Sequence, residues 1–299
     1  MIGIDTASVA GNKPIDWHKA RKAGVEFAIH RVSYGSWKDR TFANEWDRIK
    51  EAGVVRGAYA FLRFPRKGKP PVPSPAEQAK AFCHHLGAVE PGDLPIALDV
   101  EFPGKGRADT GRTASQLLQG VRKAWQVLRS QYGVPPLLYT SARVWLDDLS
   151  NLAAPDLVES PLWLARYYVK TGKAVFTKGA GILQQPPVPP PWAGEDEKRT
   201  VYRNMKYTCD NWWFHQYQGN ATKCPGFSGK VDMNLFIPVS LGAKGERVRW
   251  IERRLNIPVT GEYTKVTEQA VQNFQATKPL ITDGIVNVRT FAYLCWENQ

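Results

Sequence analysis

The chain has 299 residues, of which 43% are hydrophobic and 23% are charged, and its net charge at pH 7 is +12. Such a chain can form one large domain and a smaller one, with the composition of an ordinary globular protein. No apolar run approaches the ~20 residues of a membrane helix. The sequence therefore excludes membrane insertion by a hydrophobic helix.

The positive charge predicts attraction to anionic polymers such as those of a bacterial surface. We find no nucleic-acid-binding motif, and so we do not expect a nucleic-acid partner. The four cysteines, Cys83, Cys209, Cys224 and Cys295, form no CxxC pair. We therefore expect no metal site and no cofactor, and leave open whether Cys209 and Cys224 form a disulfide. We expect a monomer.

Strand-like and helix-like segments alternate through most of the chain. Apolar runs predict strands at 2–5, 25–32, 54–61, 94–102, 137–140, 161–168, 212–217 and 230–236. Asp16 is a candidate N-cap, and Ser74 and Thr113 each begin a capping box before a helical stripe. The repeated alternation predicts a parallel sheet with covering helices, which at this length favours a closed or nearly closed β/α barrel.

Two carboxylates stand at the end of the fourth predicted strand, in the stretch LPIALDVEF. Asp99 and Glu101 point to the same side of a strand, with Cα atoms roughly 6.6 Å apart. This spacing suits two carboxyl groups acting on one glycosidic bond, although a solvated or arginine-paired strand end would look the same. Asp5 also ends a strand, and we place Asp232 near the end of the strand at 230–236. Four acids are thus predicted at the C-terminal rim of the barrel, where β/α barrels carry their chemistry.

Two segments interrupt this pattern. The loop at 63–73 is rich in Lys, Arg and Pro, and because it follows a strand we expect it at the same rim. There it would attract an anionic wall, with turnover falling as salt rises, although a solvated loop without a role is an equal alternative. The excursion at 169–210 contains a proline-rich run, 186–191, and a charged run, 195–199. It either walls a groove or has no role.

After Pro238 the pattern changes to three short amphipathic helices, at 246–255, 265–275 and 288–296. We therefore divide the chain into residues 1–238 and 239–299, and expect each part to fold alone. The apolar positions expected to form the small core are Val248, Ile251, Leu255, Val266, Ala270, Phe274, Val288, Phe291, Ala292 and Cys295.

Short motifs in a fixed order give the first part a family resemblance. They are GIDTAS at the start, IDW at 15–17, Asp39 with Phe42 and Asn44, GAYAF at 57–61, ALDVE at 97–101, LYT at 138–140, WLARY at 163–167, HQY at 215–217 and VDMN at 231–234. Together they resemble the glycoside hydrolase family 25 muramidases, the Chalaropsis-type lysozymes, over roughly residues 1–238.

The resemblance implies a flattened, irregular, TIM-like β/α barrel with about five β/α units and extra strands. It also implies cleavage of the β-1,4 bond between N-acetylmuramic acid and N-acetylglucosamine in peptidoglycan. By motif position, Glu101 would be the general acid/base, Asp99 would orient the substrate's acetamido group, and Asp5 and Asp232 would complete the acidic cleft. The motif positions that would line the groove are Tyr59, Tyr139, Trp163, Arg166 and Gln216, with strand core packing as their alternative role. For Trp163 the two roles are equally expected.

Three positions depart from the family pattern. His30 to Gly35 stand where a KATEG-like segment is usual, Ala60 replaces a common His, and His215 replaces Trp. These changes affect the groove lining, and hence specificity, more than the acids.

Residues 239–299 are similar to the three-helix peptidoglycan-binding module, with Glu252 for the usual Gln and Asn287 for a usual Gly. A wall-binding module behind a wall hydrolase, with no signal peptide visible, looks like an antimicrobial phage endolysin. Such a protein is made in the host cytoplasm and reaches the wall after holin-type release. The alternatives are an amidase or endopeptidase, which would need a zinc site or a Cys/His pair, and a non-catalytic wall-binding protein, which would be expected to lose an acid.

Overall fold

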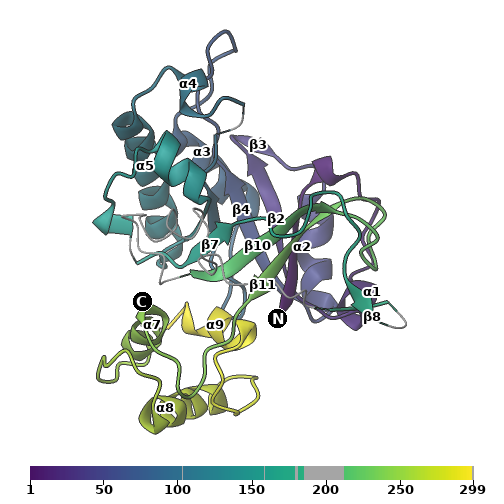
Figure 1. Ribbon diagram of the computed structural model, residues 1–299, viewed down its shortest axis with the longest axis vertical. Helices are drawn as coiled ribbons and strands as arrows, with labels where there is room; N and C mark the ends of the chain where they lie inside the picture. The colour runs from purple at the N-terminus through teal and green to yellow at the C-terminus, as the bar shows by residue number, and fades with distance from the viewer. Residues whose placement is uncertain (103, 158, 179–180, 185–211, 298–299) are drawn as a thin grey trace.

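The computed structural model describes residues 1–102, 104–157, 159–178, 181–184 and 212–297. Within these residues, eight strands close into a barrel in the order β1-β11-β10-β7-β6-β5-β4-β2, with β2 pairing back to β1 (Figure 1). The barrel strands are β1 Ile2–Thr6, β2 Val25–Tyr34, β4 Val55–Phe61, β5 Ala97–Asp99, β6 Leu137–Thr140, β7 Leu162–Ala165, β10 Trp212–Ala221 and β11 Val231–Phe236. The predicted closed β/α barrel is confirmed.

Among the described residues, three short strands lie outside the barrel. Strand β3, Trp37–Lys38, continues β2 as a hairpin at the barrel rim, and β8, Thr177–Lys178, pairs with β9, Ile182–Leu183. Most of the predicted excursion at 169–210 lies outside the described residues, as does Cys209. Cys224 is buried and is a free thiol.

One strand of the barrel runs against the others. β11 is antiparallel to both of its neighbours, β10 and β1, whereas all the other barrel pairs are parallel. Asp232 therefore stands at the beginning of its strand, not near the end as the sequence analysis expected. Because the strand is reversed, its beginning lies at the same rim as the C-terminal ends of the parallel strands, and Asp232 pairs in register with Asp5.

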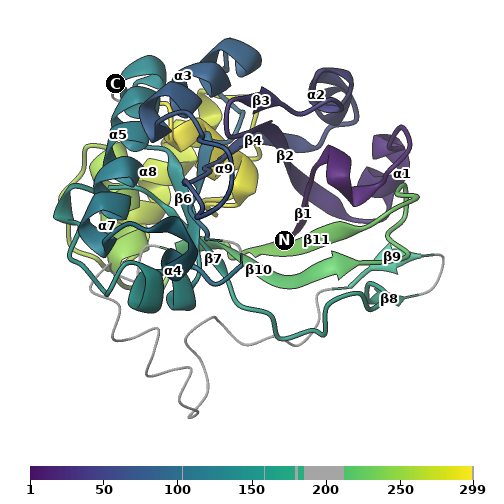
Figure 2. The ribbon, with the colours of Figure 1, turned by 90° about the horizontal axis from the view of Figure 1, so that it is seen from above.

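The helices surround the strands, with α1 and α2 on one side and α3 and α5 on the other (Figure 2). They are α1 Trp17–Lys22, α2 Phe42–Glu51, α3 Pro75–Leu86, α4 Arg107–Thr110 and α5 Ala114–Tyr132. The capping boxes predicted at Ser74 and Thr113 are both formed, and the Asp16 side chain accepts a hydrogen bond from Lys19 N. Local sequence signals therefore fix where these helices begin.

Aromatic side chains fill the interior of the barrel at its lower end, which is the end opposite the rim that carries the acids. Phe27, Phe214 and Phe236 pack together there, with ring centroids 5.2 Å apart for both Phe27–Phe214 and Phe214–Phe236. Gly3 makes room for them, because a Cβ at this position would lie 2.3 Å from the Phe27 ring. The inward-facing side chains nearer the opposite rim are polar, and they form the site.

The C-terminal segment forms three helices, α7 Glu246–Arg254, α8 Lys265–Ala276 and α9 Val288–Leu294. Val248, Ile251, Val288, Phe291, Ala292 and Cys295 are buried as expected. Leu255 and Phe274 are partly buried against this core, but the buried face of α8 differs from the prediction, since Val266 is 67% exposed and the fully buried residues are Thr267, Val271 and Gln275. Gln275 faces inward because its side chain accepts from Gly284 N and donates to Thr290, so an internal polar contact replaces the expected apolar one.

These helices pack against the lower end of the barrel, at the end where β1 begins (Figure 1). Phe291 of α9 lies 4.5 Å from Trp213, 5.5 Å from Phe236 and 5.7 Å from Phe214, measured between ring centroids. Trp296 Nε1 donates to the carbonyl oxygen of Asp93 at 2.9 Å. The two parts of the chain thus share one hydrophobic core. Within the described residues, no helix is long and apolar enough to cross a membrane.

Candidate active site

Four carboxylates gather at the rim of the barrel, as the sequence analysis predicted. Asp5 lies near the end of β1, Asp99 ends β5, Glu101 follows two residues later, and Asp232 begins β11. Their charges act on one another: Asp232 raises the pKa of Asp5 and of Glu101, and Glu101 raises that of Asp99. The four carboxyl groups therefore form one electrostatically coupled cluster.

Asp5 is the most firmly held of the acids. Its Oδ2 accepts hydrogen bonds from Gln216 Nε2 at 2.8 Å and from Asn234 Nδ2 at 2.7 Å. Burial raises its pKa well above the usual range, the charge of Asp232 raises it further, and the two amide donors oppose the shift. Asp5 is therefore fixed in position by neutral donors that leave its proton affinity high.

Asp99 is buried, and its Oδ1 has no hydrogen-bond partner. Burial raises its pKa well above the usual range, followed by the charges of Glu101 and Asp5, while Arg31 acts in the opposite direction. Arg31 is itself paired with Asp39, through Nη2 to Oδ2 at 2.8 Å. A buried carboxyl oxygen without a partner is costly in a finished core. It is the arrangement expected of a group that completes its hydrogen bonds with a bound ligand.

Glu101, two residues beyond the end of β5, lines a cavity of about 240 Å³. Burial raises its pKa, the charge of Asp232 raises it further, and the charge of Arg143 lowers it. A carboxyl group of this kind keeps its proton at a higher pH than a solvated glutamate does. Because it also borders an open cavity, it can give that proton to a bound molecule.

Gln216 bonds to an acid directly, and Tyr139 is joined to that acid through Gln216. Gln216 accepts hydrogen bonds at Oε1 from the hydroxyls of Tyr139 at 2.8 Å and Tyr167 at 2.9 Å while it donates to Asp5. Tyr59 and Trp163 lie beneath, in the core, and Trp163 is only 2% exposed. Trp163 packs on Tyr139 with centroids 4.6 Å apart and donates to Asn234 Oδ1 at 2.7 Å. In this structure Trp163 therefore supports the site from below, which matches the core alternative.

Arg166 follows directly after β7, whose Trp163 side chain faces the barrel interior. The guanidinium of Arg166 stacks on Tyr168, 4.6 Å from the ring centroid, and its charge acts on His215. The cations whose charges reach the acids are Arg31 and Arg143. The expected place of Arg166 in the groove lining stays a prediction.

Several residues that help to form the site were assigned no role from the sequence. Asn234 stands in the motif VDMN and Asp39 in another quoted motif, but neither was assigned a role. Arg31 shares the inner face of β2 with Phe27 and Ile29, and this two-residue spacing was a usable signal. Tyr167 ends the quoted motif WLARY but was assigned no role, and Arg143 follows a strand end and carried no signal beyond that position. Among the described residues, no group of three or more His, Cys, Asp or Glu is arranged to hold a metal ion.

Comparison with known proteins agrees with this geometry. The model of glycosyl hydrolases family 25 matches residues 4–184, and a peptidoglycan binding domain model matches residues 244–294. Lysozyme M1 of Streptomyces globisporus is 25% identical over 240 residues, which are 78% of this chain and 67% of that protein. The autolytic lysozyme of Clostridium acetobutylicum is 29% identical over 170 residues, which are 56% of this chain and 46% of that protein.

Solved structures share the fold. The bacterial lysozyme of Streptomyces coelicolor superposes with a TM-score of 0.57 and 24% identity, over 79% of this chain and 91% of that one. The family 25 lysozyme of Aspergillus fumigatus gives a TM-score of 0.54 at 22% identity, over 79% and 93% of the two chains. Since the family model spans more than half of the sequence and includes Asp5, Asp99 and Glu101, the chain belongs to glycosyl hydrolases family 25.

Proposed function

We propose that this glycoside hydrolase is an N-acetylmuramidase that cleaves the β-1,4 bond between N-acetylmuramic acid and N-acetylglucosamine in bacterial peptidoglycan. The observation that carries the proposal is the pair of acids at the end of β5. Glu101 has a raised pKa and borders a cavity, and Asp99 has a buried carboxyl oxygen without a hydrogen-bond partner. A glycosidase needs a carboxyl group that is protonated when the leaving group departs. The lysozymes of Streptomyces and Clostridium named above support the substrate class.

In the proposed mechanism, Glu101 donates its proton to the glycosidic oxygen as the bond to the anomeric carbon breaks. Asp99 holds the N–H of the substrate's 2-acetamido group while the acetamido oxygen attacks the anomeric carbon and forms a cyclic intermediate. Glu101, now ionised, takes a proton from water, which opens the ring with net retention of configuration. Such substrate assistance is one of the recognised exceptions to an enzyme nucleophile. It gives the unpartnered Asp99 Oδ1 a ligand donor.

Direct attack by Asp99 is the rival mechanism within the same class. It would form a glycosyl ester on Asp99 instead of a cyclised sugar. A thiazoline mimic of the cyclic intermediate separates the two. Tight competitive inhibition by the thiazoline supports substrate assistance, and a glycosyl ester trapped on Asp99 contradicts it.

The reaction class is tested by digesting purified peptidoglycan and analysing the products. A muramidase creates new reducing ends, and borohydride reduction should convert the terminal muramic acid to muramicitol. An amidase or endopeptidase would instead release amino groups. New amino groups without new reducing ends would overturn the proposal.

We also propose that residues 239–299 hold the enzyme on the wall, with 1–238 as the catalytic part. The match of residues 244–294 to a peptidoglycan binding domain supports this role. Residues 239–299 fused to a carrier protein should sediment with purified sacculi, whereas the carrier alone should stay in solution. A fusion whose helices are folded by circular dichroism but which does not sediment would contradict the assignment.

A role in lysis is a further proposal, in which the protein is made in a bacterial host and reaches the wall from inside after a phage holin opens the membrane. The combination of a wall hydrolase and a wall-binding segment, together with a net charge of +12, supports it. Expression in a host should leave cells intact until the membrane is permeabilised, and lysis should follow at once. Release and lysis without permeabilisation would contradict this route.

A further inference from the structure

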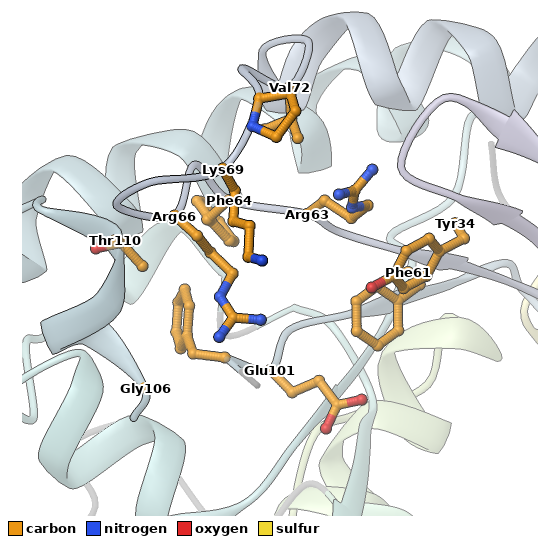
Figure 3. Close-up of a pocket in the computed structure, with 12 residues that line it drawn as sticks. Tyr34, Phe61, Arg63, Phe64, Arg66, Lys69, Val72, Glu101, Gly106 and Thr110 are labelled. Atoms are coloured by element: carbon orange, nitrogen blue, oxygen red, sulfur yellow. The ribbon is translucent and has the colours of Figure 1, made fainter. Parts of the chain in front are cut away.

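The cavity beside Glu101 has a second wall that the reaction does not use. Figure 3 shows this wall above the Glu101 carboxylate, built by the loop at 63–73 with Tyr34 and Phe61 to one side. The cavity holds about 240 Å³ and is lined by three cationic side chains, Arg63, Arg66 and Lys69, as well as aromatic rings. An acidic catalytic centre and a basic pocket therefore share one space.

The basic loop is held in place at both of its ends. Gln78 of α3 is 1% exposed; it accepts from Arg63 N at 2.8 Å and donates to the carbonyl oxygens of Arg63 and Pro73, each at 2.7 Å. In the middle, Lys67 N donates to the carbonyl oxygen of Asp109 at 2.7 Å. The cations thus stand on an anchored segment, so the pocket is formed before any ligand arrives.

The three cationic side chains differ in the groups that they contact. The Arg63 guanidinium stacks on Tyr34 and on Trp37, 4.9 Å and 4.6 Å from the ring centroids. Arg66 donates to Asp109 at 3.0 Å. Lys69 has no ion-pair partner within the described residues, and its ammonium group is directed into the cavity (Figure 3). The pocket therefore offers one ammonium group that can pair with an anion, and two neighbouring guanidinium groups that make the electrostatic potential of the pocket more positive.

The chemistry of the lining selects a ligand. A neutral sugar ring that filled the pocket would desolvate Lys69 without pairing its charge, which is unfavourable. A carboxylate pairs with ammonium and guanidinium groups in strong charge-assisted hydrogen bonds. The Phe64 and Phe102 rings, 4.9 Å apart, provide an apolar surface for the carbon chain that carries it. The pocket therefore matches a carboxylate on a short, partly apolar arm.

We propose that this pocket binds a carboxylate carried by the muramoyl sugar next to the scissile bond, on its peptide stem or, where the stem has been removed, on its lactyl group. The inference rests on the proposed muramidase function and adds to it the part of the substrate that the Lys69 pocket recognises. Lys69 thereby becomes a specificity-determining residue that contributes to substrate binding rather than to bond cleavage.

Lys67 provides a matched control. It belongs to the same loop and carries the same charge, but it does not line the cavity, and its side chain lies near Gly111. Long-range attraction to an anionic substrate would respond equally to the loss of either lysine. A pocket that binds a carboxylate responds only to the loss of Lys69.

The test measures kcat and KM of K69Q and K67Q on soluble glycan fragments that carry peptide stems. Loss of one charge-assisted hydrogen bond predicts that K69Q raises KM by about tenfold or more at unchanged kcat. K67Q should match the wild-type enzyme. When the carboxyl groups of the fragments are amidated, K69Q and the wild type should become equal.

The lactyl carbonyl is part of an amide bond wherever a stem is attached, so a K69Q defect on stem-bearing fragments assigns a stem carboxylate. Fragments stripped of their stems by an amidase carry a newly freed lactyl carboxylate, and a K69Q defect on them shows that the pocket also accepts the lactyl group. The proposal is overturned if K67Q is as impaired as K69Q, or if K69Q remains impaired on amidated fragments. Calorimetric binding of stem-bearing fragments to E101Q and to E101Q/K69Q keeps this test independent of turnover, whereas a wild-type enzyme that makes no reducing ends rejects the muramidase proposal itself.

Discussion

Asp5 is placed for function at the expense of stability. Its carboxyl group is buried, and the folded protein binds its proton more tightly than the unfolded chain does, because its pKa is raised. The stability associated with this proton is complete below the unfolded pKa and is lost as pH rises through the folded pKa. Asparagine has nearly the same shape as aspartate but no charge, so placing it at position 5 removes this pH-dependent loss of stability.

D5N should therefore be more stable than the wild type at pH 7, by at least about 1 kcal/mol in the free energy of unfolding, and less active. The gain should vanish below about pH 4, where Asp5 is protonated in both states. Denaturant unfolding at pH 7 and at pH 3.5 measures both. D156N, which alters an exposed acid paired with Arg122, should show no such gain. A D5N protein no more stable than the wild type at pH 7 would refute this account of Asp5.

The pH dependence of catalysis should follow the charges around Glu101. Its protonated form is lost as pH rises, so the alkaline limb of kcat/KM reports its pKa. Burial raises this pKa first and the charge of Asp232 second, while Arg143 lowers it. D232N should therefore move the alkaline limb to lower pH, and R143Q should move it to higher pH. Profiles on soluble glycan fragments test both, and shifts in the same direction for the two variants would be inconsistent with this assignment.

At the level of single residues, the sequence located the acids and Gln216, but not the other groups that bond to them. Asp99 and Glu101 were readable because a strand's alternation and a two-residue spacing fix their common side. The hydrogen bonds from Asn234 to Asp5 and from Tyr167 to Gln216 join strands far apart in the chain. Such contacts depend on barrel closure, which local patterns do not encode.

At the level of elements, most strand positions were predicted closely because each is a short apolar run, but the strand expected at 94–102 forms only over Ala97–Asp99. The direction of β11 was not predicted, since an apolar run looks the same in either direction. Asp232 reached the expected rim only because the strand is reversed and the acid stands at its beginning. The buried face of α8 was missed for a similar reason, as Gln275 is buried by a hydrogen-bond network rather than by its hydrophobicity.

Strand β1 gives a prediction at this scale. A Cβ on Gly3 would lie 2.3 Å from the Phe27 ring, so G3A should displace β1 or the ring. Overpacking of this kind costs about 1–3 kcal/mol, and activity should fall as well because β1 carries Asp5. A smaller side chain beneath it should relieve the clash, so stability measurements should find G3A/F27L less impaired than the two single variants predict together. Strict additivity would show that Phe27 is not what excludes a side chain at position 3.

For the whole molecule, the packing of α7–α9 against the barrel bears on the expectation that residues 1–238 and 239–299 fold independently. The division at Pro238 remains a prediction, but the aromatic rings of Trp213, Phe214 and Phe236 are covered by Phe291. Removal of the C-terminal helices would expose these rings to water. The two parts therefore depend on each other for stability, despite the change in sequence pattern between them.

The shared core predicts a single unfolding transition for the full chain. F291A should lower the stability of the barrel as well as of the helices, by about 3–5 kcal/mol. I281A changes a residue that is 76% exposed and should have little effect. Calorimetry combined with near-ultraviolet circular dichroism checks this. Two separate transitions, with that of the barrel unchanged in F291A, would mean that the contact contributes little.

The proposed muramidase reaction is tested most directly by the reducing ends released from purified peptidoglycan by the wild type and by E101Q. We expect the wild type to release muramic acid ends and E101Q to fold normally but to release them about 10²–10⁴ times more slowly. E51Q, which alters an exposed glutamate at the end of α2, should retain full activity. A folded E101Q that releases muramic acid ends at the wild-type rate would contradict the assignment of Glu101 as the general acid/base.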